Sequence, residues 1–261
     1  MPAALLTSAT DGGYVLVDDL YWIVSGRQVF DDEIFYLPVA GIDPFGNETT
    51  IAWDDHALFV TSLADALGNV ITVDYDYRVL AARQLTDAND NRTAVAFDTR
   101  GVVIAMAKMG KAGASEGDTL EAPTSVFSYD VFAWTHDGEP NWVRTQAREA
   151  HGDAGTAWLE RISYFDGSGN TILDKVSAEP GLAPERDVDG ELVLVGGLPN
   201  LVASDPRWVG SGRTVFDNKG NPVEQYEPYF SSTDAFEGEA ELREQGVTVV
   251  LRYDPLGRLV R

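Results

Sequence analysis

The stretch Asp43-Pro44-Phe45-Gly46-Asn47 contains a five-residue phrase that returns along the chain: Asp, two variable residues, Gly and often Asn. The first four phrases begin at residues 43, 65, 87 and 98, so their period is about eleven residues or twice that. The copy that begins at Asp87 has Asp90 in place of Gly. We identify as the structural turn residues Asp43, Gly46, Asp65, Gly68, Asp87, Asp98, Gly101, Asp166, Gly169, Asp217, Gly220, Asp254 and Gly257.

The phrase predicts a tight turn between two antiparallel strands. Asp at its first position accepts hydrogen bonds from the backbone ahead, and Gly adopts the left-handed conformation that closes a hairpin. Asp90 belongs to a residue type that tolerates the same conformation. Between turns, apolar and polar residues alternate as in half-buried strands. We predict strands at 14–17, 34–39, 70–75, 102–106, 158–164, 192–195 and 247–253.

These signals predict an all-β fold: a long antiparallel meander that forms a curved or spiral open sheet. At most one short helix is expected, over 234–245, with Asp234 as its N-cap, Glu237 as the capping-box partner and Gly246 as the stop. We predict a single domain over 1–261. Irregular, loop-rich insertions fall at about 110–125 and 179–190, where Gly and Pro interrupt the repeat.

Composition excludes several classes of protein. The chain carries 42 Asp and Glu against 19 Lys and Arg, which gives a formal net charge of −23, yet 44% of its residues are apolar. It is therefore an acidic protein with a real core, and neither nucleic acid nor a membrane is an expected partner. There is no Cys and there are three His, so we expect no cofactor and assign no metal site. Residues 1–7 lack the features of a secretory signal.

Further motifs link the turns to a known family. Four of the turn Asp residues follow an aromatic residue directly, namely Phe97, Phe165, Phe216 and Tyr253. This pattern resembles the RHS repeat, also called the YD repeat. The stretches 76–80 with 86–92, 207–230 and 246–258 are similar, in order and spacing, to phrases in the C-terminal RHS region of the B component of bacterial Tc (insecticidal) toxin complexes. The segment 207–230, Arg-Trp-Val-Gly through Gln-Tyr-Glu-Pro-Tyr-Phe, carries the most specific match.

The resemblance implies a structural role. In that family, RHS sheets of the B and C components form a hollow shell around a toxin polypeptide that is later released into a target cell. By resemblance, this chain is a segment of such a shell and not an enzyme. Its partners are other RHS segments or the C component, and the cargo is a polypeptide. We expect a secreted virulence factor that is exported without an N-terminal signal after assembly in the cytoplasm.

Two departures from the family pattern limit which family properties can be assigned to this chain. The stretch 111–129 is shortened, and Asp90 replaces a usual Gly. The family's self-cleaving aspartyl protease depends on downstream motifs that are not found here, so Asp254-Pro255 does not inherit that role. Because residues 258–261 only begin a returning strand, we expect the chain to be part of a longer polypeptide.

Other motifs leave alternatives open. Gly113 to Gly117 fits a G-x-S-x-G pattern, and Ser231 to Thr233 with Glu237 and Glu239 superficially resembles an ADP-ribosyltransferase set. Asp87, Asn89, Asn91 and Asp98 have the offsets of a calcium loop. His56, His136 and His151 each lie near acids. The main alternative is a free-standing module that binds glycan or calcium, and a small acidic glycosidase is a third.

Overall fold

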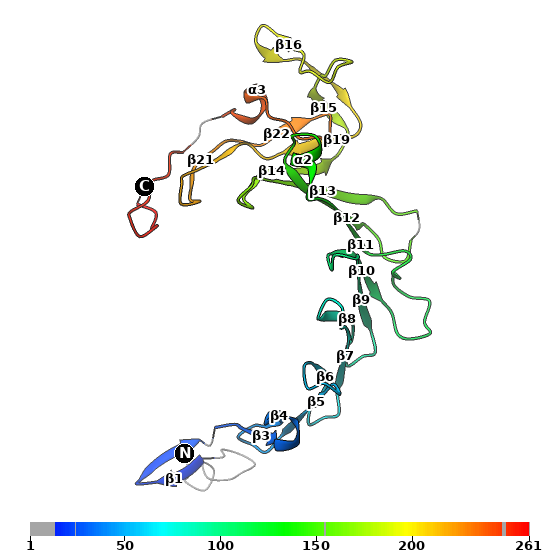
Figure 1. Cartoon of the computed structure of the whole chain (residues 1–261), viewed down its shortest axis with the longest axis vertical. Coiled ribbons are helices and arrows are strands. Elements are labelled where there is room, and N and C mark those ends of the chain that lie inside the picture. The colour runs from blue at the N-terminus through cyan, green and yellow to red at the C-terminus, as the bar shows by residue number, and fades with distance from the viewer. Residues whose placement is uncertain (1–13, 24, 154, 247–248, 261) are drawn as a thin grey trace. The chain divides into compact units, whose positions relative to one another are not determined.

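The computed structural model describes residues 14–23, 25–153, 155–246 and 249–260 (Figure 1). Antiparallel β-structure dominates it, which confirms the predicted all-β meander. The chain separates into two compact units, Met1–Thr124 and Ser125–Arg261. No helix in the described part of the chain has the length and apolar character needed to span a membrane. The single domain that we predicted over 1–261 stays a prediction.

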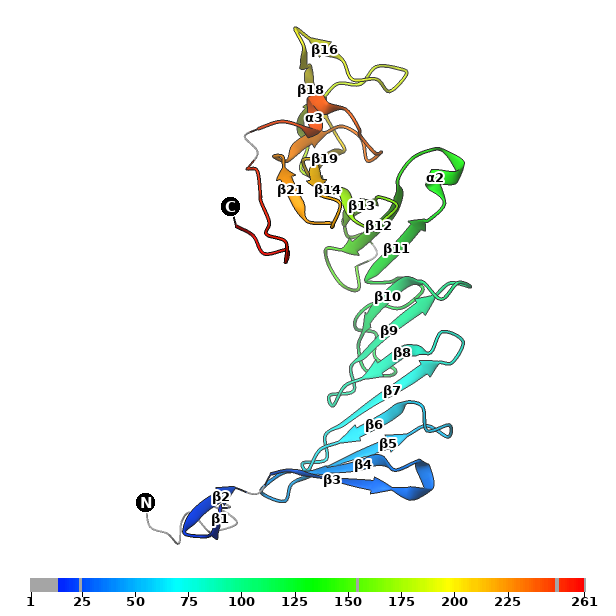
Figure 2. The same ribbon diagram turned by 60° about the vertical axis from the view of Figure 1, so that its left-hand side comes forward.

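The first unit is a meander in which each strand pairs with the next one in sequence (Figure 2). A separate hairpin, β1 with β2, precedes it. The elements are β1 (Tyr14–Val17), β2 (Leu20–Ile23), β3 (Arg27–Asp31), the 3-10 turn η1 (Asp32–Ile34), β4 (Leu37–Ile42), β5 (Glu48–Trp53), β6 (Val60–Ala64), β7 (Val70–Asp76), β8 (Ala81–Thr86), β9 (Arg92–Phe97) and β10 (Val103–Met109).

Two kinds of hairpin alternate along this meander. The pairs β4 with β5, β6 with β7 and β8 with β9 keep a regular register. The pairs β3 with β4, β5 with β6, β7 with β8 and β9 with β10 each contain a register shift. A β-bulge bends its strand and increases the local twist. The hairpins at one end of the strands are therefore more strongly bent and twisted than the hairpins at the other end.

The first unit is thin. Among its described residues, the buried apolar ones are all alanines: Ala40, Ala94, Ala105 and Ala107. Larger apolar side chains such as Phe30, Leu63 and Ile71 remain 53%, 40% and 38% exposed. A sheet normally buries one face against a second layer. In this unit the backbone ladder and the turns therefore carry a larger share of the stability than a packed core does.

The second unit combines a sheet with smaller hairpins. In the sheet β11, β12, β13, β14, β19 and β22 pair in that order. The elements are β11 (Ser125–Asp130), α2 (Ala133–His136), β12 (Asn141–Arg148), β13 (Trp158–Phe165), β14 (Thr171–Ala178), β15 (Gly181–Pro184), β16 (Leu194–Val195), β17 (Leu198–Pro199), β18 (Leu201–Ser204), β19 (Arg207–Gly210), β20 (Thr214–Phe216), β21 (Pro222–Gln225), β22 (Tyr229–Ser231) and α3 (Ala240–Arg243).

A compact core forms only in this second unit, among the described residues. Its members come from β13, β14, β19, β22 and α3, and they are Ile162, Tyr164, Leu173, Trp208, Tyr229 and Leu242. The Tyr164 hydroxyl donates to the Asp234 carbonyl at 2.7 Å, and burial raises the pKa of this tyrosine. The segment before α3 is thereby fastened to β13.

Several predicted boundaries were wrong. The helix expected over 234–245 is the single turn α3, which begins at Ala240 with Glu239 as N-cap. Glu237 does not form a capping box, because its carboxylate is buried against two cations. The strand expected at 34–39 begins at Leu37, since Phe35 and Tyr36 adopt left-handed φ values of 63° and 56°.

Two further differences concern the ends of the second unit. The helical turn α2 is an addition to the predicted elements. Of the strand expected at 247–253, residues 247–248 lie outside the described residues. Tyr253 forms an isolated bridge to Leu259 in place of a ladder. The predictions at 14–17, 70–75 and 158–164 match β1, β7 and β13 to within one residue.

Candidate functional site

The turn at 43–47 shows what the repeated phrase does. Asp43 Oδ1 accepts hydrogen bonds from the backbone N–H groups of Phe45 and Asn47, both at 2.8 Å. The Asn47 side-chain amide donates to Asp43 Oδ2 at 2.7 Å. The Gly46 N–H donates to the Asp43 carbonyl at 3.1 Å, and Gly46 has a φ of 88°. One carboxylate thus satisfies three donors, and Gly closes the turn without steric cost.

The other copies use the same arrangement with small changes. Asn69, Asn91, Asn170 and Asn221 donate to the second carboxylate oxygens of Asp65, Asp87, Asp166 and Asp217. At Asp98 and Asp254 an arginine takes that place, with Arg100 Nε at 2.8 Å and Arg258 Nε at 2.7 Å. Left-handed φ values at the fourth position are shared by Gly46, Gly68, Asp90, Gly101, Gly169, Gly220 and Gly257.

These hydrogen bonds change the acidity of the turns. Donation from the Asn side chain lowers the pKa of Asp43, Asp65 and Asp87 below the usual aspartate value of 3.8. At Asp98 the backbone N–H of Val102 is the main cause of the lowered pKa. The turn carboxylates are therefore stabilised as anions, and their charge contributes to the acidic surface.

The structure also shows how the turns are arranged. Because successive strands run in opposite directions, the turns at 43–47, 65–69 and 87–91 lie at one end of the strands. The turn that begins at Asp98 lies at the other end, beyond β9. Asp87 and Asp98 are thus separated by a full strand, and the calcium-loop offsets do not bring them together.

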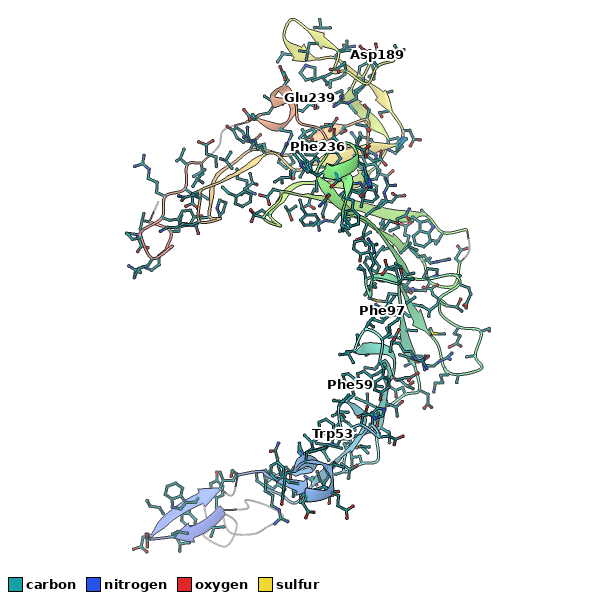
Figure 3. The ribbon with its side chains drawn as sticks, viewed as in Figure 1. Trp53, Phe59, Phe97, Asp189, Phe236 and Glu239 are labelled. Carbon is teal, nitrogen blue, oxygen red and sulfur yellow. The ribbon has the colours of Figure 1, made fainter. Side chains whose placement is uncertain are left out.

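The sequence analysis missed three turns of related design. Asp187 to Glu191 has the same backbone hydrogen bonds, with Asp187 Oδ1 accepting from the Asp189 and Glu191 N–H groups at 2.9 and 3.0 Å. Its Asp-x-x-Gly spacing was present in the sequence, and Figure 3 labels Asp189. The turns after Asp54 and Asp76 use Ala57 and Leu80 at φ values of 54° and 55°, which no search for Gly could find.

Aromatic side chains reinforce the strand ends in the first unit. Phe59 stacks on Tyr75 with ring centroids 4.4 Å apart, and the Tyr77 ring meets Phe59 edge-on at 5.7 Å. The Tyr77 hydroxyl donates to Asp54, which raises the pKa of Tyr77 to about 12. The Trp53 Nε1–H donates to the Pro38 carbonyl at 2.9 Å; Figure 3 labels Trp53 and Phe59. Cross-strand contacts of this kind are the usual unit of sheet stabilisation.

A buried ion cluster lies in the second unit. Lys175 on β14 is fully buried, and its Nζ lies 2.7 Å from Glu237 Oε2, 3.1 Å from Ser231 Oγ and 2.8 Å from the Thr233 carbonyl. These three acceptors satisfy all three ammonium protons. Burial lowers the pKa of Lys175. The charged form is nevertheless matched by a carboxylate that is itself 2% exposed.

Arg186, which follows β15, completes the cluster. Its guanidinium contacts Glu237 Oε1 at 2.6 Å, Glu239 Oε1 at 2.7 Å and the Gly190 carbonyl at 2.7 Å. Burial by itself raises the pKa of Glu239, but the hydrogen bond and the charge of Arg186 outweigh burial, so the pKa lies below its usual value. Figure 3 labels Glu239 before α3. Segments as distant as β14 and the residues before α3 are therefore joined by charge-assisted hydrogen bonds.

The two motifs that resemble enzyme sites, Ser231 to Thr233 with the two glutamates and Gly113 to Gly117, lie in surroundings that explain them without catalysis. Ser231 and Glu237 both contact Lys175, and Glu237 and Glu239 both contact Arg186. Both carboxylates therefore face cations, and the Ser231 hydroxyl also donates to the Thr233 carbonyl. Ser115 lies exposed in a loop closed by a bridge between Met109 and Gly117. A nucleophile elbow needs a helix directly after its Ser, and the chain continues here without one.

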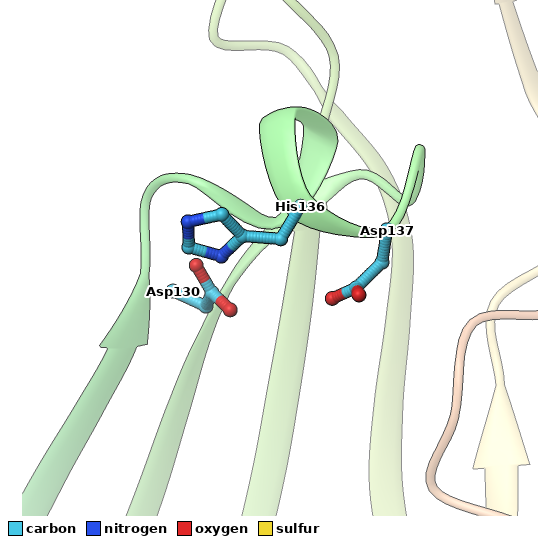
Figure 4. Close-up of side chains that lie close together, drawn as sticks. All are labelled: Asp130, His136 and Asp137. Carbon is cyan, nitrogen blue, oxygen red and sulfur yellow. The ribbon is translucent and has the colours of Figure 1, made fainter.

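One group of side chains has the composition of a metal site. Asp130 ends β11, His136 ends α2 and Asp137 follows it (Figure 4). One ligand atom from each lies within 4.8 Å of the others. His136 and Asp137 are neighbours in sequence, but Asp130 reaches them only through the fold of the β11–β12 connection, so the sequence alone assigned no metal site.

Solved structures with the same fold come from Tc toxin complexes. The crystal structure of TcdB2-TccC3 matches with a TM-score of 0.79 at 24% identity, covering 100% of this chain and 14% of that chain. TcdB2-TccC3 without its hypervariable C-terminal region gives a TM-score of 0.77 at 20% identity, covering 100% and 16%. A Tc holotoxin pore from Photorhabdus luminescens gives 0.73 at 20% identity, covering 100% and 16%. No protein-family model and no curated protein matches.

Proposed function

We propose that this chain is a segment of an RHS-repeat shell that encloses a toxin polypeptide in a Tc-like toxin complex. The observation that carries the proposal is the thin meander with repeated acidic turns, whose fold matches TcdB2-TccC3 over the whole chain. The chain spans a small part of the length of those neighbours. The remaining strands of the wall would come from other RHS segments or from a C component.

The physical design of the first unit suits a wall. A wall that is one sheet thick separates two spaces with few residues. Both faces of the sheet are then exposed, one to each space. The buried alanines and exposed larger side chains of β3 to β10 have that character. Stability must then come from the hairpins, which is where the Asp turns and the cross-strand aromatic contacts act.

Enclosure requires no chemistry by this segment. The carboxylates of the repeated turns accept backbone N–H groups, and Glu237 and Glu239 pair with Lys175 and Arg186 in the second unit. We therefore propose a non-catalytic role. As part of such a complex the protein would act outside the producing cell, after assembly in the cytoplasm and export without an N-terminal signal.

Protease protection tests the proposal. The natural polypeptide that contains this chain would be co-expressed with its C component and treated with a nonspecific protease. We expect the cargo to resist cleavage until the complex is denatured. A Glu237→Gln variant, which leaves Lys175 buried without its counter-charge, should admit protease, whereas Glu239→Gln at the rim of the cluster should protect as the wild type does. Cargo that is cleaved equally in all three complexes would refute enclosure.

A further inference from the structure

The connection between β11 and β12 holds two carboxylates and an imidazole close together. The ligand atoms of Asp130, His136 and Asp137 all lie within 4.8 Å of one another (Figure 4). Ligands that bind a first-row metal ion at about 2.0–2.2 Å are at most about 4.4 Å apart, by the geometry of two such bonds. Small rotations of these side chains would therefore bring all three onto one ion.

The backbone that carries these groups is fixed. The Phe132 N–H donates to Asp130 Oδ1 at 2.9 Å, which leaves Asp130 Oδ2 available. The Asp137 N–H donates to the Ala133 carbonyl at 2.8 Å, and the His136 N–H to the Phe132 carbonyl at 3.1 Å. Ala133 is buried beneath the turn. The backbone of the site would thus lose little conformational entropy when an ion binds, and only the side chains would need to be ordered.

The group differs from the carboxylates of the buried ion cluster in having no protein cation beside it among the described residues. Glu237 and Glu239 face Lys175 and Arg186, and Asp174 faces Arg161 at 2.8 Å. Among the ion pairs of the described residues, none involves Asp130, His136 or Asp137. Two converging carboxylates without a protein cation create a local negative potential, and a divalent ion would neutralise it.

The donor set favours one class of ion. Calcium and magnesium prefer oxygen ligands alone, whereas an imidazole nitrogen suits zinc and other first-row transition metals. We propose that Asp130, His136 and Asp137 form a binding site for a divalent first-row transition-metal ion. His136 and Asp137 are exposed, so water would complete the coordination sphere. The ion would join the end of β11 to α2.

Calorimetric titration of the whole chain with Zn²⁺, after treatment with a chelator, tests the site. We expect one ion per chain. His136→Gln and Asp137→Asn should each weaken binding at least tenfold, and Ca²⁺ in tenfold excess should not displace Zn²⁺. His56→Gln is the matched control, because His56 also lies beside acids but belongs to no such group. It should bind as the wild type does.

A second measurement reports the ligand directly. Co²⁺ bound to the chain should show a visible absorption spectrum that His136→Gln changes and His56→Gln does not. Thermal unfolding without metal should be the same for Asp137→Asn and the wild type, since the Asp137 side chain is exposed. Equal Zn²⁺ affinity in the wild type and His136→Gln would overturn the proposal. Displacement by Ca²⁺ would overturn it as well, because it would indicate a site made of oxygen ligands alone.

Discussion

At the scale of the residue, the fourth position of each turn decides whether the hairpin closes. In the seven turns that the sequence predicts, this position carries six glycines and Asp90, all with left-handed φ, and Gly190 in the Asp187 turn has the same conformation. An L-residue with a β-carbon is strained there, and a β-branched one most of all. Asp90, with a φ of 66°, shows that a short polar side chain can take the same place.

This strain predicts the effect of a single substitution. Gly68, with a φ of 83° and open space around it, should lose about 1–2 kcal/mol of unfolding free energy when changed to Val, through backbone strain alone. Gly41→Ala is the matched control, because Gly41 also has open space but lies in a strand without positive φ. Urea unfolding of both variants checks this. A Gly68→Val variant as stable as Gly41→Ala would contradict the turn model.

The turn carboxylates predict a dependence of stability on pH. A carboxyl group whose pKa is lower in the folded protein than its usual value of 3.8 stabilises the fold above that value. This stabilisation is lost as the pH falls from about 4 through the folded pKa. In the triple variant of Asn47, Asn69 and Asn91 to Ala, the pKa of each partner Asp should rise towards 3.8. Carbon-13 titration of the carboxyl groups measures it, and unchanged values would show that the Asn amides do not act on them.

At the scale of the element, sequence reasoning worked where the structure is local. A turn and its two strands occupy one continuous stretch, such as 60–76 for β6 and β7, so the Asp-x-x-Gly phrase and the alternation around it predict β7 and β13 closely. The prediction of a helix over 234–245 was wrong because a contact between residues distant in sequence decides the structure there. Glu237 has the spacing of a capping residue, but Lys175, more than sixty positions earlier, pairs with it and places it in the interior.

The buried ion cluster provides the prediction at this scale. Glu237→Gln should lower the stability of the second unit by about 3–5 kcal/mol, the usual cost of breaking one partner out of a buried pair. Glu239→Gln should cost less, because the Glu239 side chain is 29% exposed and Arg186 keeps its contact with Glu237. Hydrogen exchange in β14 and β22 reports on this unit specifically. Equal protection in the two variants would show that the cluster contributes little.

The candidate metal site shows a second limit of sequence reasoning. His136 and Asp137 are neighbours in sequence, and such a pair is common on protein surfaces. Asp130 joins them only because the chain makes the one-turn helix α2 between β11 and β12. A helix of four residues is too short to show a helical pattern of apolar residues in the sequence, so α2 could not be predicted.

At the scale of the whole molecule, the central feature is the sheet of the first unit, on which the described residues of that unit build no second layer. Composition predicted a substantial core, since 44% of the residues are apolar. The described core is instead concentrated in the second unit. Much of the apolar surface of β3 to β10 stays exposed, which a wall between two spaces explains better than a free-standing domain does.

The most direct test is to image the assembled complex by electron cryo-microscopy, using the natural polypeptide that contains this chain together with its C component. Our account predicts that β3 to β10 form part of the wall of a closed shell and that the shell contains density for the cargo. A complex in which these strands pack against a folded globular domain, with the cargo outside, would contradict it.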